Sequence, residues 1–151
     1  MKRIAVIGAG SWGTTLAQVL NDNGHKVALW VRNPEKANKI AQSRYNADYL
    51  PQLKLADAIE ITSDLTQTVS NAEILLLAVP SHGMANLCCQ LSKITDCTDK
   101  VSVSCTKGFE YHSGLRMSEI IKSYFPSATV AVLSGPNHAE EIALRQPAAT
   151  V

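Results

Sequence analysis

Three glycines, Gly8, Gly10 and Gly13, follow directly on the apolar run 4–7 and open a stretch with helical periodicity. A strand, a tight turn and a helix form the setting in which the pyrophosphate of a dinucleotide binds. In such a turn the first glycine reverses the chain, the second lets the backbone approach the phosphates, and the third lets the helix pack closely on the strand. The segment therefore predicts a dinucleotide-binding fold whose first helix presents its free N–H groups to the pyrophosphate.

The rest of the chain alternates between apolar runs and helical patterns. Six runs are predicted to be strands: 4–7, 26–31, 59–62, 73–79, 101–105 and 129–133. Strands that alternate with helices indicate an α/β protein with a doubly wound parallel sheet, a Rossmann-like dinucleotide-binding fold. We expect one dinucleotide-binding domain over residues 1–151. A seventh strand is expected to begin within 148–151, and because the chain stops inside that run we expect it to be part of a longer protein.

Composition and charge exclude several classes of function. The formal net charge of +1 gives no electrostatic argument for a nucleic-acid partner. No run approaches the roughly 18 apolar residues of a membrane span, so we expect a cytoplasmic protein with no membrane insertion. The cysteines lack the paired spacing of a zinc site, and we expect no metal and four free thiols that behave as small buried hydrophobic groups. These cysteines are Cys88, Cys89, Cys97 and Cys105.

In an open parallel sheet the ligand lies outside the carboxyl ends of the strands, so the residues that follow the strands should form one rim. Arg32 follows the second strand, roughly twenty residues beyond the glycine turn, where an acidic residue would bind the ribose 2′-hydroxyl of NAD. An arginine at this position can pair with the 2′-phosphate of NADP. We therefore expect NADP(H) to be favoured, with NAD(H) as the alternative; otherwise Arg32 is a solvated residue at a helix end.

Two further rim segments carry polar groups. Lys107 follows the fifth strand, where its ammonium could hold a substrate phosphate or polarise a carbonyl beside the nicotinamide. Pro136, after the sixth strand, is expected in the first turn of a helix whose free N–H groups form a second anion site. His82 and His138 lie on the same rim, and we favour solvated positions over acid–base roles for both.

Several segments, taken in order along the whole chain, resemble bacterial NAD(P)-dependent glycerol-3-phosphate dehydrogenase. They are the glycine turn extended to Ala17, Asn46-Ala47-Asp48-Tyr49-Leu50-Pro51, Ala78-Val79-Pro80-Ser81, Thr106-Lys107-Gly108-Phe109-Glu110 and Ser134-Gly135-Pro136. The resemblance implies an enzyme that reversibly reduces dihydroxyacetone phosphate, a small phosphate-bearing substrate, to sn-glycerol 3-phosphate for phospholipid synthesis. A homodimer of the full-length protein remains open.

The resemblance also assigns expected roles to individual residues. Beside the glycines, the expected cofactor contacts are Ser11, Trp12, Arg32, Tyr49 and Ala139. Lys107 would lie between cofactor and substrate, and Gly135 and Asn137 would line the substrate site. The family usually has serine or threonine at the position of Asn137, whose amide can still donate a hydrogen bond.

The family places its general-base lysine in a C-terminal helical substrate domain, which we expect beyond Val151. No residue of this chain is therefore predicted to be a catalytic base, and the chain alone is expected to bind cofactor with little or no turnover. Two alternatives stay open at this point. One is another two-domain dehydrogenase, of the 6-phosphogluconate or ketopantoate reductase type, and the other is a non-catalytic module that senses NAD(P)H, because a Rossmann fold alone does not specify catalysis.

Overall fold

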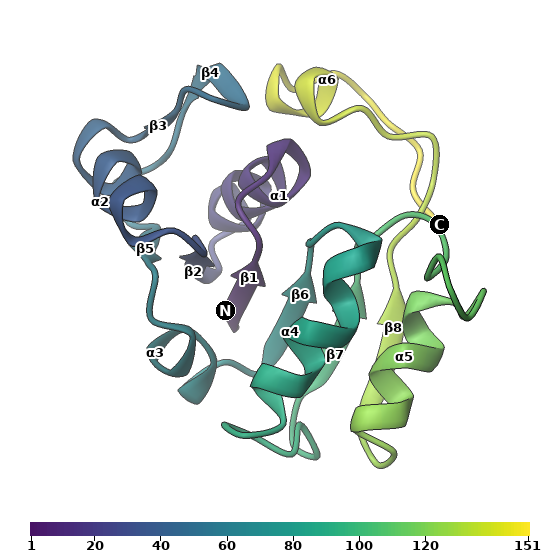
Figure 1. Cartoon of the computed structure of the whole chain (residues 1–151). Helices are drawn as coiled ribbons and strands as arrows, with labels where there is room; N and C mark the ends of the chain where they lie inside the picture. Colours follow the sequence, from purple (N-terminus) through teal and green to yellow (C-terminus); the bar gives the residue numbers. More distant parts are fainter.

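The computed structural model describes residues 1–151 and contains a six-stranded, fully parallel sheet (Figure 1). Its strands are β1 (Arg3–Ile7), β2 (Lys26–Trp30), β5 (Glu60–Thr62), β6 (Ile74–Leu77), β7 (Val101–Ser104) and β8 (Thr129–Val132). Their order across the sheet is β5-β2-β1-β6-β7-β8. The order reverses between β1 and β6, which is the switch point where doubly wound sheets bind ligands. The predicted Rossmann-like fold class is confirmed.

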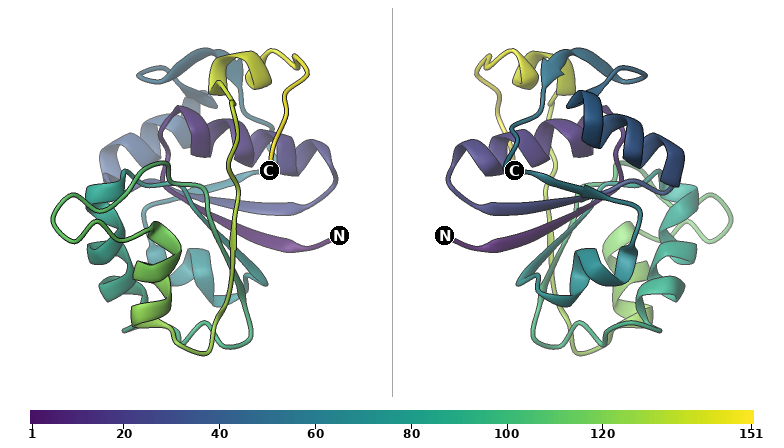
Figure 2. Two further views of the ribbon diagram at one scale, coloured as in Figure 1. Left: turned by 90° about the vertical axis from the view of Figure 1, so that its right-hand side faces the viewer. Right: turned by 90° about the vertical axis from the view of Figure 1, so that its left-hand side faces the viewer.

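Helices cover both faces of the sheet, as Figure 2 shows. The helices are α1 (Ser11–Asp22), α2 (Pro34–Ser43), α3 (Leu65–Ser70), α4 (Met84–Leu91), α5 (Met117–Tyr124) and α6 (Ala139–Ala143), with a 3-10 turn at Ser81–Gly83. Helices α1 and α2 pack on one face, and α3, α4 and α5 pack on the other. None of these helices has the length and apolarity needed to cross a bilayer.

The alternation of side chains along β1 divides the core into two layers. Ile4 and Val6 point to the face covered by α1 and α2, while Ala5 and Ile7 point to the face covered by α3, α4 and α5. All four are buried. A strand that is apolar on both faces is what a central position in a parallel sheet requires, and β1 lies between β2 and β6. This packing fixes the start of α1 at the carboxyl edge of the sheet.

The segment after β2 is held by a helix cap. The side-chain oxygen of Asn33 accepts a hydrogen bond from the Lys36 backbone N–H at 2.9 Å, and Pro34 is the first residue of α2. Proline suits this position because the first N–H groups of a helix have no internal partner. Arg32 therefore lies between the carboxyl end of β2 at Trp30 and the capped start of α2.

The segment after α2 is more regular than expected. We expected an irregular stretch, but it contains an antiparallel hairpin of β3 (Tyr45–Asn46) and β4 (Leu50–Lys54). The Tyr49 N–H donates to the Asn46 carbonyl at 3.0 Å and closes the turn, and Leu50 is fully buried. Pro51 is tolerated because each strand of a two-stranded sheet is an edge. The hairpin lies beside α6, above α1 (Figure 1).

The last part of the chain differs from expectation in two ways. Residues 148–151 form no strand, although Ser134 and Val151 exchange two backbone hydrogen bonds of 2.9 and 2.8 Å. The placement of Pro136 in the first turn of a helix was wrong. Helix α6 begins at Ala139 with His138 at its N-cap, because residues 135–137 form a tight turn in which the Asn137 N–H donates to the Gly135 carbonyl at 2.9 Å.

The cysteines are free thiols. Cys88 and Cys97 are completely buried and Cys105 nearly so, as expected, whereas Cys89 is partly exposed. Burial raises the pKa of the Cys88 and Cys105 thiols to about 12, since the thiolate form loses its hydration. They therefore act as packing groups.

Candidate dinucleotide-binding site

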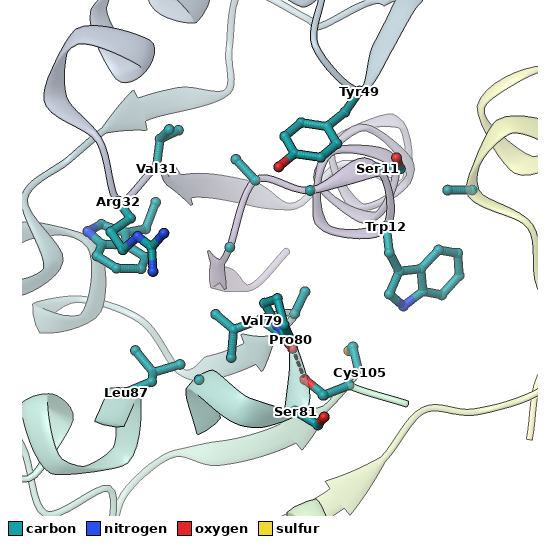
Figure 3. Close-up of a pocket in the computed structure, with 18 of the residues that line it drawn as sticks. Ser11, Trp12, Val31, Arg32, Tyr49, Val79, Pro80, Ser81, Leu87 and Cys105 are labelled. Carbon is teal, nitrogen blue, oxygen red and sulfur yellow. Dashed lines mark hydrogen bonds between the residues drawn. The ribbon is translucent and has the colours of Figure 1, made fainter. Parts of the chain in front are cut away.

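A cleft of about 900 Å³ lies along the carboxyl ends of the strands (Figure 3). Its walls come from segments that are far apart in the sequence but meet at this edge of the sheet. They are the glycine turn 8–12, residues 30–33 with Lys36, Tyr49, residues 78–83, three residues of α4, residues 105–107 and residues 137–140. The predicted rim thus forms one continuous site.

The glycine turn is packed too closely for side chains at two of its three glycines. Gly8 has a φ of +115°, and a Cβ atom there would lie 2.5 Å from the Ala78 carbonyl oxygen. A Cβ atom on Gly13 would lie 1.9 Å from the Gly8 carbonyl oxygen. Gly10 differs, since a Cβ atom there would meet nothing within 4 Å and Gly10 lines the cleft. Gly10 therefore keeps open the space that a phosphate group would occupy.

Helix α1 directs unpaired donors toward this space. Its first internal hydrogen bond runs from the Thr14 N–H to the Gly10 carbonyl at 3.0 Å, so the N–H groups of residues 11–13 have no partner within the helix. The first turn carries no acidic side chain. The partial positive charge of the helix end is therefore available to an anion in the cleft.

Asn46, in the hairpin of β3 and β4, holds the glycine turn through hydrogen bonds of its side chain. Its side-chain Nδ2 donates to the Ala9 carbonyl at 2.8 Å and lies 2.9 Å from the Thr14 hydroxyl oxygen. Asn46 is buried, with 3% of its surface exposed. It joins the hairpin to the glycine turn and to α1. Asn46 belongs to one of the motifs that resemble the family, but its sequence context predicts no role for it, since burial of a polar side chain in a turn segment leaves no periodic signal.

One wall of the cleft is basic. Arg32 makes no hydrogen bond or ion pair, and it lies on the opposite side of the cleft from Trp12 (Figure 3). Nearby, Lys36 Nζ contacts Asp48 Oδ2 at 2.6 Å and lies 6.0 Å from the centre of the Tyr49 ring. The hydrogen bond and charge of Asp48 raise the pKa of Lys36, and Lys36 in turn lowers the pKa of the Asp48 carboxyl.

The wall near β7 carries a second cation. Lys107 Nζ donates to the Asn137 carbonyl oxygen at 3.2 Å. The Thr106 hydroxyl beside it donates to the carbonyl of Val79 at 2.6 Å, which ties the end of β7 to the end of β6. Asn137 is buried, and its side-chain Oδ1 has no hydrogen-bond partner.

The structure brings together most residues that the sequence analysis placed in the site. Those that line the cleft are Gly8, Gly10, Ser11, Trp12, Arg32, Tyr49, Lys107, Asn137 and Ala139. Two do not line it. Gly13 packs under the turn against Gly8, and Gly135, with a φ of +134°, packs against the backbone of Ala149 and Thr150. His82 and His138 also line the cleft.

Other cleft residues had not been assigned a role from the sequence. Trp30, Asn33, Lys36 and Glu140 line the walls, as do Asn86, Leu87 and Gln90 of α4. These side chains line the cleft only because one face of a helix, or one side of a strand end, turns toward the carboxyl edge of the sheet. The sequence alone does not indicate which face that is. The described residues bring together no group of three or more histidine, cysteine or acidic side chains that could hold a metal ion.

The residues present fit a nicotinamide dinucleotide. The open space at Gly10 and the free N–H groups of α1 suit a pyrophosphate, and the exposed guanidinium of Arg32 suits a further phosphate. The apolar and aromatic groups around them suit flat rings.

Comparisons with known proteins agree with this geometry. Residues 3–151 match the family model described as NAD-dependent glycerol-3-phosphate dehydrogenase N-terminus. The chain is 45% identical to a glycerol-3-phosphate dehydrogenase [NAD(P)+] of Corynebacterium glutamicum strain R, over 100% of this chain and 46% of the relative. It is 42% identical to the protein of that name from Bacillus subtilis strain 168, over 97% and 43% of the two chains.

A solved structure extends the similarity to the fold. The crystal structure of glycerol-3-phosphate dehydrogenase from Coxiella burnetii matches with a TM-score of 0.92 and 30% identity, over 99% of this chain and 45% of that one. The chain thus spans less than half the length of the relatives it matches. Because the family model matches almost the entire sequence, the chain belongs to the family of NAD-dependent glycerol-3-phosphate dehydrogenase N-terminal regions.

Proposed function

We propose that this chain is the cofactor-binding part of an enzyme that reversibly reduces dihydroxyacetone phosphate to sn-glycerol 3-phosphate with NAD(P)H. The observation that carries the proposal is the single cleft that joins the glycine turn to Lys107. The names of the relatives support the same reaction. We further propose a cytoplasmic enzyme whose product supplies phospholipid synthesis.

The residues of the cleft have separate roles in this proposal. The free N–H groups at the start of α1 bind the pyrophosphate, and Gly10 lets the backbone approach it. Arg32 pairs with the 2′-phosphate, so NADP(H) binds more tightly than NAD(H). Ser11, Trp12, Tyr49 and Ala139 complete the cofactor contacts. When bound, the nicotinamide supplies or accepts the hydride.

We propose Lys107 as a substrate contact. Its ammonium reaches the Asn137 carbonyl, so it is held at the end of the cleft formed by β7 and the segment before α6. A cation there can bind the substrate phosphate or polarise its carbonyl oxygen. Asn137 lies beside it and takes part in the same contact surface, whereas Gly135 supports that surface through its turn.

The general base belongs, in this proposal, to a C-terminal helical substrate domain of the longer protein. Without that domain the substrate is not oriented against the nicotinamide. The lost positioning raises the activation free energy of hydride transfer by about 7–11 kcal/mol. The 151-residue chain should therefore bind NADPH without measurable reduction of dihydroxyacetone phosphate. Robust turnover by this chain alone would contradict the division of labour between two domains.

A fluorescence titration tests cofactor binding directly. Trp12 and Trp30, the two tryptophans of the chain, both line the cleft, so bound NADPH should quench their emission. Arg32→Ala should weaken NADPH binding by about tenfold, as expected for the loss of one charge-assisted contact, and leave NADH binding within about twofold. Equal losses for both cofactors would count against a 2′-phosphate contact.

An activity measurement tests the reaction. In a protein of the relatives' full length, NADPH oxidation with dihydroxyacetone phosphate should be lost in Lys107→Ala, while NADPH binding is retained. If that protein binds NADPH but reduces no dihydroxyacetone phosphate, the non-catalytic sensing module becomes the better description. Binding of a partner that depends on NAD(P)H would then support it.

A further inference from the structure

We propose that Lys36 is a second determinant of NADP(H) specificity and that Asp48 acts as its exchangeable counter-ion. In the absence of a 2′-phosphate, Lys36 pairs with Asp48; when NADP(H) binds, the ammonium turns to the phosphate beside Arg32. This inference rests on the proposed cofactor function and adds to it a residue that the sequence analysis did not assign.

The first support is the position of Lys36. Arg32 directly precedes Asn33, the N-cap residue of α2, and Lys36 lies in the first turn of that helix; all three line the cleft, as does Tyr49. The Asn33 cap holds the Lys36 backbone through a hydrogen bond of 2.9 Å. The base of the lysine side chain is therefore fixed in the first turn of α2, four residues after Arg32 in the chain, while its long aliphatic part leaves the ammonium free to reorient.

The second support is the balance of charge. A phosphate monoester carries about −1.5 to −2 charges at neutral pH, so Arg32 alone neutralises only part of it. Lys36 is the other cation on this wall, since Lys107 contacts Asn137 near the end of β7. The single carboxylate among the cleft residues, Glu140, belongs to α6. A phosphate at Arg32 would therefore find a second cation and no anionic side chain in the wall itself.

The third support is the nature of the ion pair. Lys36 Nζ and Asp48 Oδ2 are 2.6 Å apart, yet their side chains are 52% and 53% exposed. Pairs that are this accessible to water contribute little net stability, so a dianion can compete for the ammonium. Asp48 does not line the cleft, so its carboxylate lies outside the space that the ligand would occupy. A neutral 2′-hydroxyl offers no such competition, so NAD(H) leaves the pair intact.

The pair also lies close to Tyr49. Lys36 Nζ lies 6.0 Å from the centre of the Tyr49 ring, and Tyr49 follows Asp48 directly in the hairpin turn. The distance is at the limit of a cation–π contact. The exchange of Lys36 between Asp48 and phosphate therefore occurs beside a ring that itself lines the cleft.

The test compares the dissociation constants of NADPH and NADH for variants of the 151-residue chain, measured by quenching of tryptophan fluorescence. Lys36→Met should weaken NADPH binding by about tenfold and NADH binding by less than about twofold. Lys36→Arg should keep most of the NADPH affinity. Lys39→Met removes the same charge from an exposed position of α2 outside the cleft and should change the ratio of the two constants by less than about twofold.

Asp48→Asn tests the counter-ion. It should strengthen NADPH binding by about two- to fivefold at low salt, because the phosphate no longer competes with a carboxylate for the Lys36 ammonium. This gain in affinity should shrink at high salt. Weaker NADPH binding in Asp48→Asn would overturn the exchange and make Asp48 a residue that positions Lys36. Unchanged NADPH binding in Lys36→Met, or equal losses for both cofactors, would overturn the specificity role of Lys36.

These outcomes are distinct from failure of the proposed function. If the unaltered chain binds neither NADPH nor NADH, the cofactor site itself is wrong. If it binds both and Lys36→Met has no selective effect, the proposed function stands and only this inference fails. The three residues altered in these four variants, Lys36, Lys39 and Asp48, are all exposed, and circular dichroism of each variant verifies that it is folded.

Discussion

The side-chain amide of Asn46 donates a hydrogen bond of 2.8 Å to the carbonyl oxygen of Ala9, the residue between the first two glycines of the turn. The same amide lies 2.9 Å from the hydroxyl oxygen of Thr14 in α1. Both Asn46 and Thr14 are almost completely buried. The hairpin that carries Asn46 therefore determines the orientation of the peptide that borders the phosphate space.

Replacing Asn46 with leucine should destabilise the chain and weaken cofactor binding. The change removes the hydrogen-bond partner of the part-buried Ala9 carbonyl and of the buried Thr14 hydroxyl, which costs about 1–3 kcal/mol in the free energy of unfolding. Urea unfolding measures this loss, and the NADPH titration measures the effect on the turn. Asn38→Leu is the control, because Asn38 is exposed on α2. A variant with normal stability and normal NADPH affinity would show that the Asn46 contacts do not hold the turn.

The glycines of the turn should respond differently to alanine. Gly10→Ala should keep its stability, since a Cβ atom there meets nothing within 4 Å, but lose NADPH affinity because the methyl group occupies the phosphate space. Gly13→Ala should lose both, because its Cβ atom would lie 1.9 Å from the Gly8 carbonyl oxygen. Helix propensity alone predicts the opposite sign for Gly13, about 1 kcal/mol of stabilisation.

The two glycine variants form a matched pair. Thermal unfolding compares their stability, and NADPH titration compares their affinity for the cofactor. The result that would contradict the close packing of α1 on β1 is a Gly13→Ala protein as stable as the unaltered chain. Tight NADPH binding by Gly10→Ala would mean that the pyrophosphate does not approach the backbone at this glycine.

The fold was predictable because its signals are local. The glycine turn, the six apolar runs and the Asn33-Pro34 cap each depend on a few neighbouring residues. The turn and the cap occur where they were predicted, and each strand end lies within two residues of its predicted position. The parallel order follows from the alternation with helices. The hairpin of β3 and β4 was missed because β3 has only two residues, too few for an alternating pattern.

The site was predictable in part. Residues at strand ends, such as Arg32 and Lys107, could be collected from the order of the elements. Asn46, Lys36 and Glu140 could not, since their positions depend on how the hairpin and the starts of α2 and α6 pack around the sheet edge. The misplaced helix start at Pro136 has the same origin, because a tight turn at Gly135 delays α6 to Ala139.

The start of α5 provides a test by pH. Glu119 accepts hydrogen bonds from the side chain and the backbone N–H of Arg116, and these contacts lower the pKa of the Glu119 carboxyl to about 2. Since the folded pKa is below the ordinary value of 4.5, the contribution to stability is complete above that value and is lost as the pH falls toward about 2. Both side chains are substantially exposed, so added salt should weaken the effect.

A carboxyl titration by NMR measures this directly. Arg116→Ala should return the Glu119 pKa toward 4.5, whereas Arg145→Ala, which removes an arginine paired with Asp22 instead, should leave it low. A Glu119 pKa near 4.5 in the unaltered chain would show that the capping contact does not persist in solution.

The four thiols should react at very different rates with a disulfide reagent at pH 8. With pKa values of about 12, Cys88 and Cys105 hold only about one part in ten thousand as thiolate, and both are buried. Cys97 is also buried, and its pKa is raised by the same loss of hydration. Cys89, on the partly exposed side of α4, should therefore give a single fast equivalent in the native protein. Cys89→Ser should abolish that phase, and unfolding in urea should expose the remaining three thiols.

A fast phase that persists in Cys89→Ser would place Cys105, which lines the cleft, within reach of the reagent. NADPH should then suppress that phase, which would make the thiol a reporter of cofactor binding.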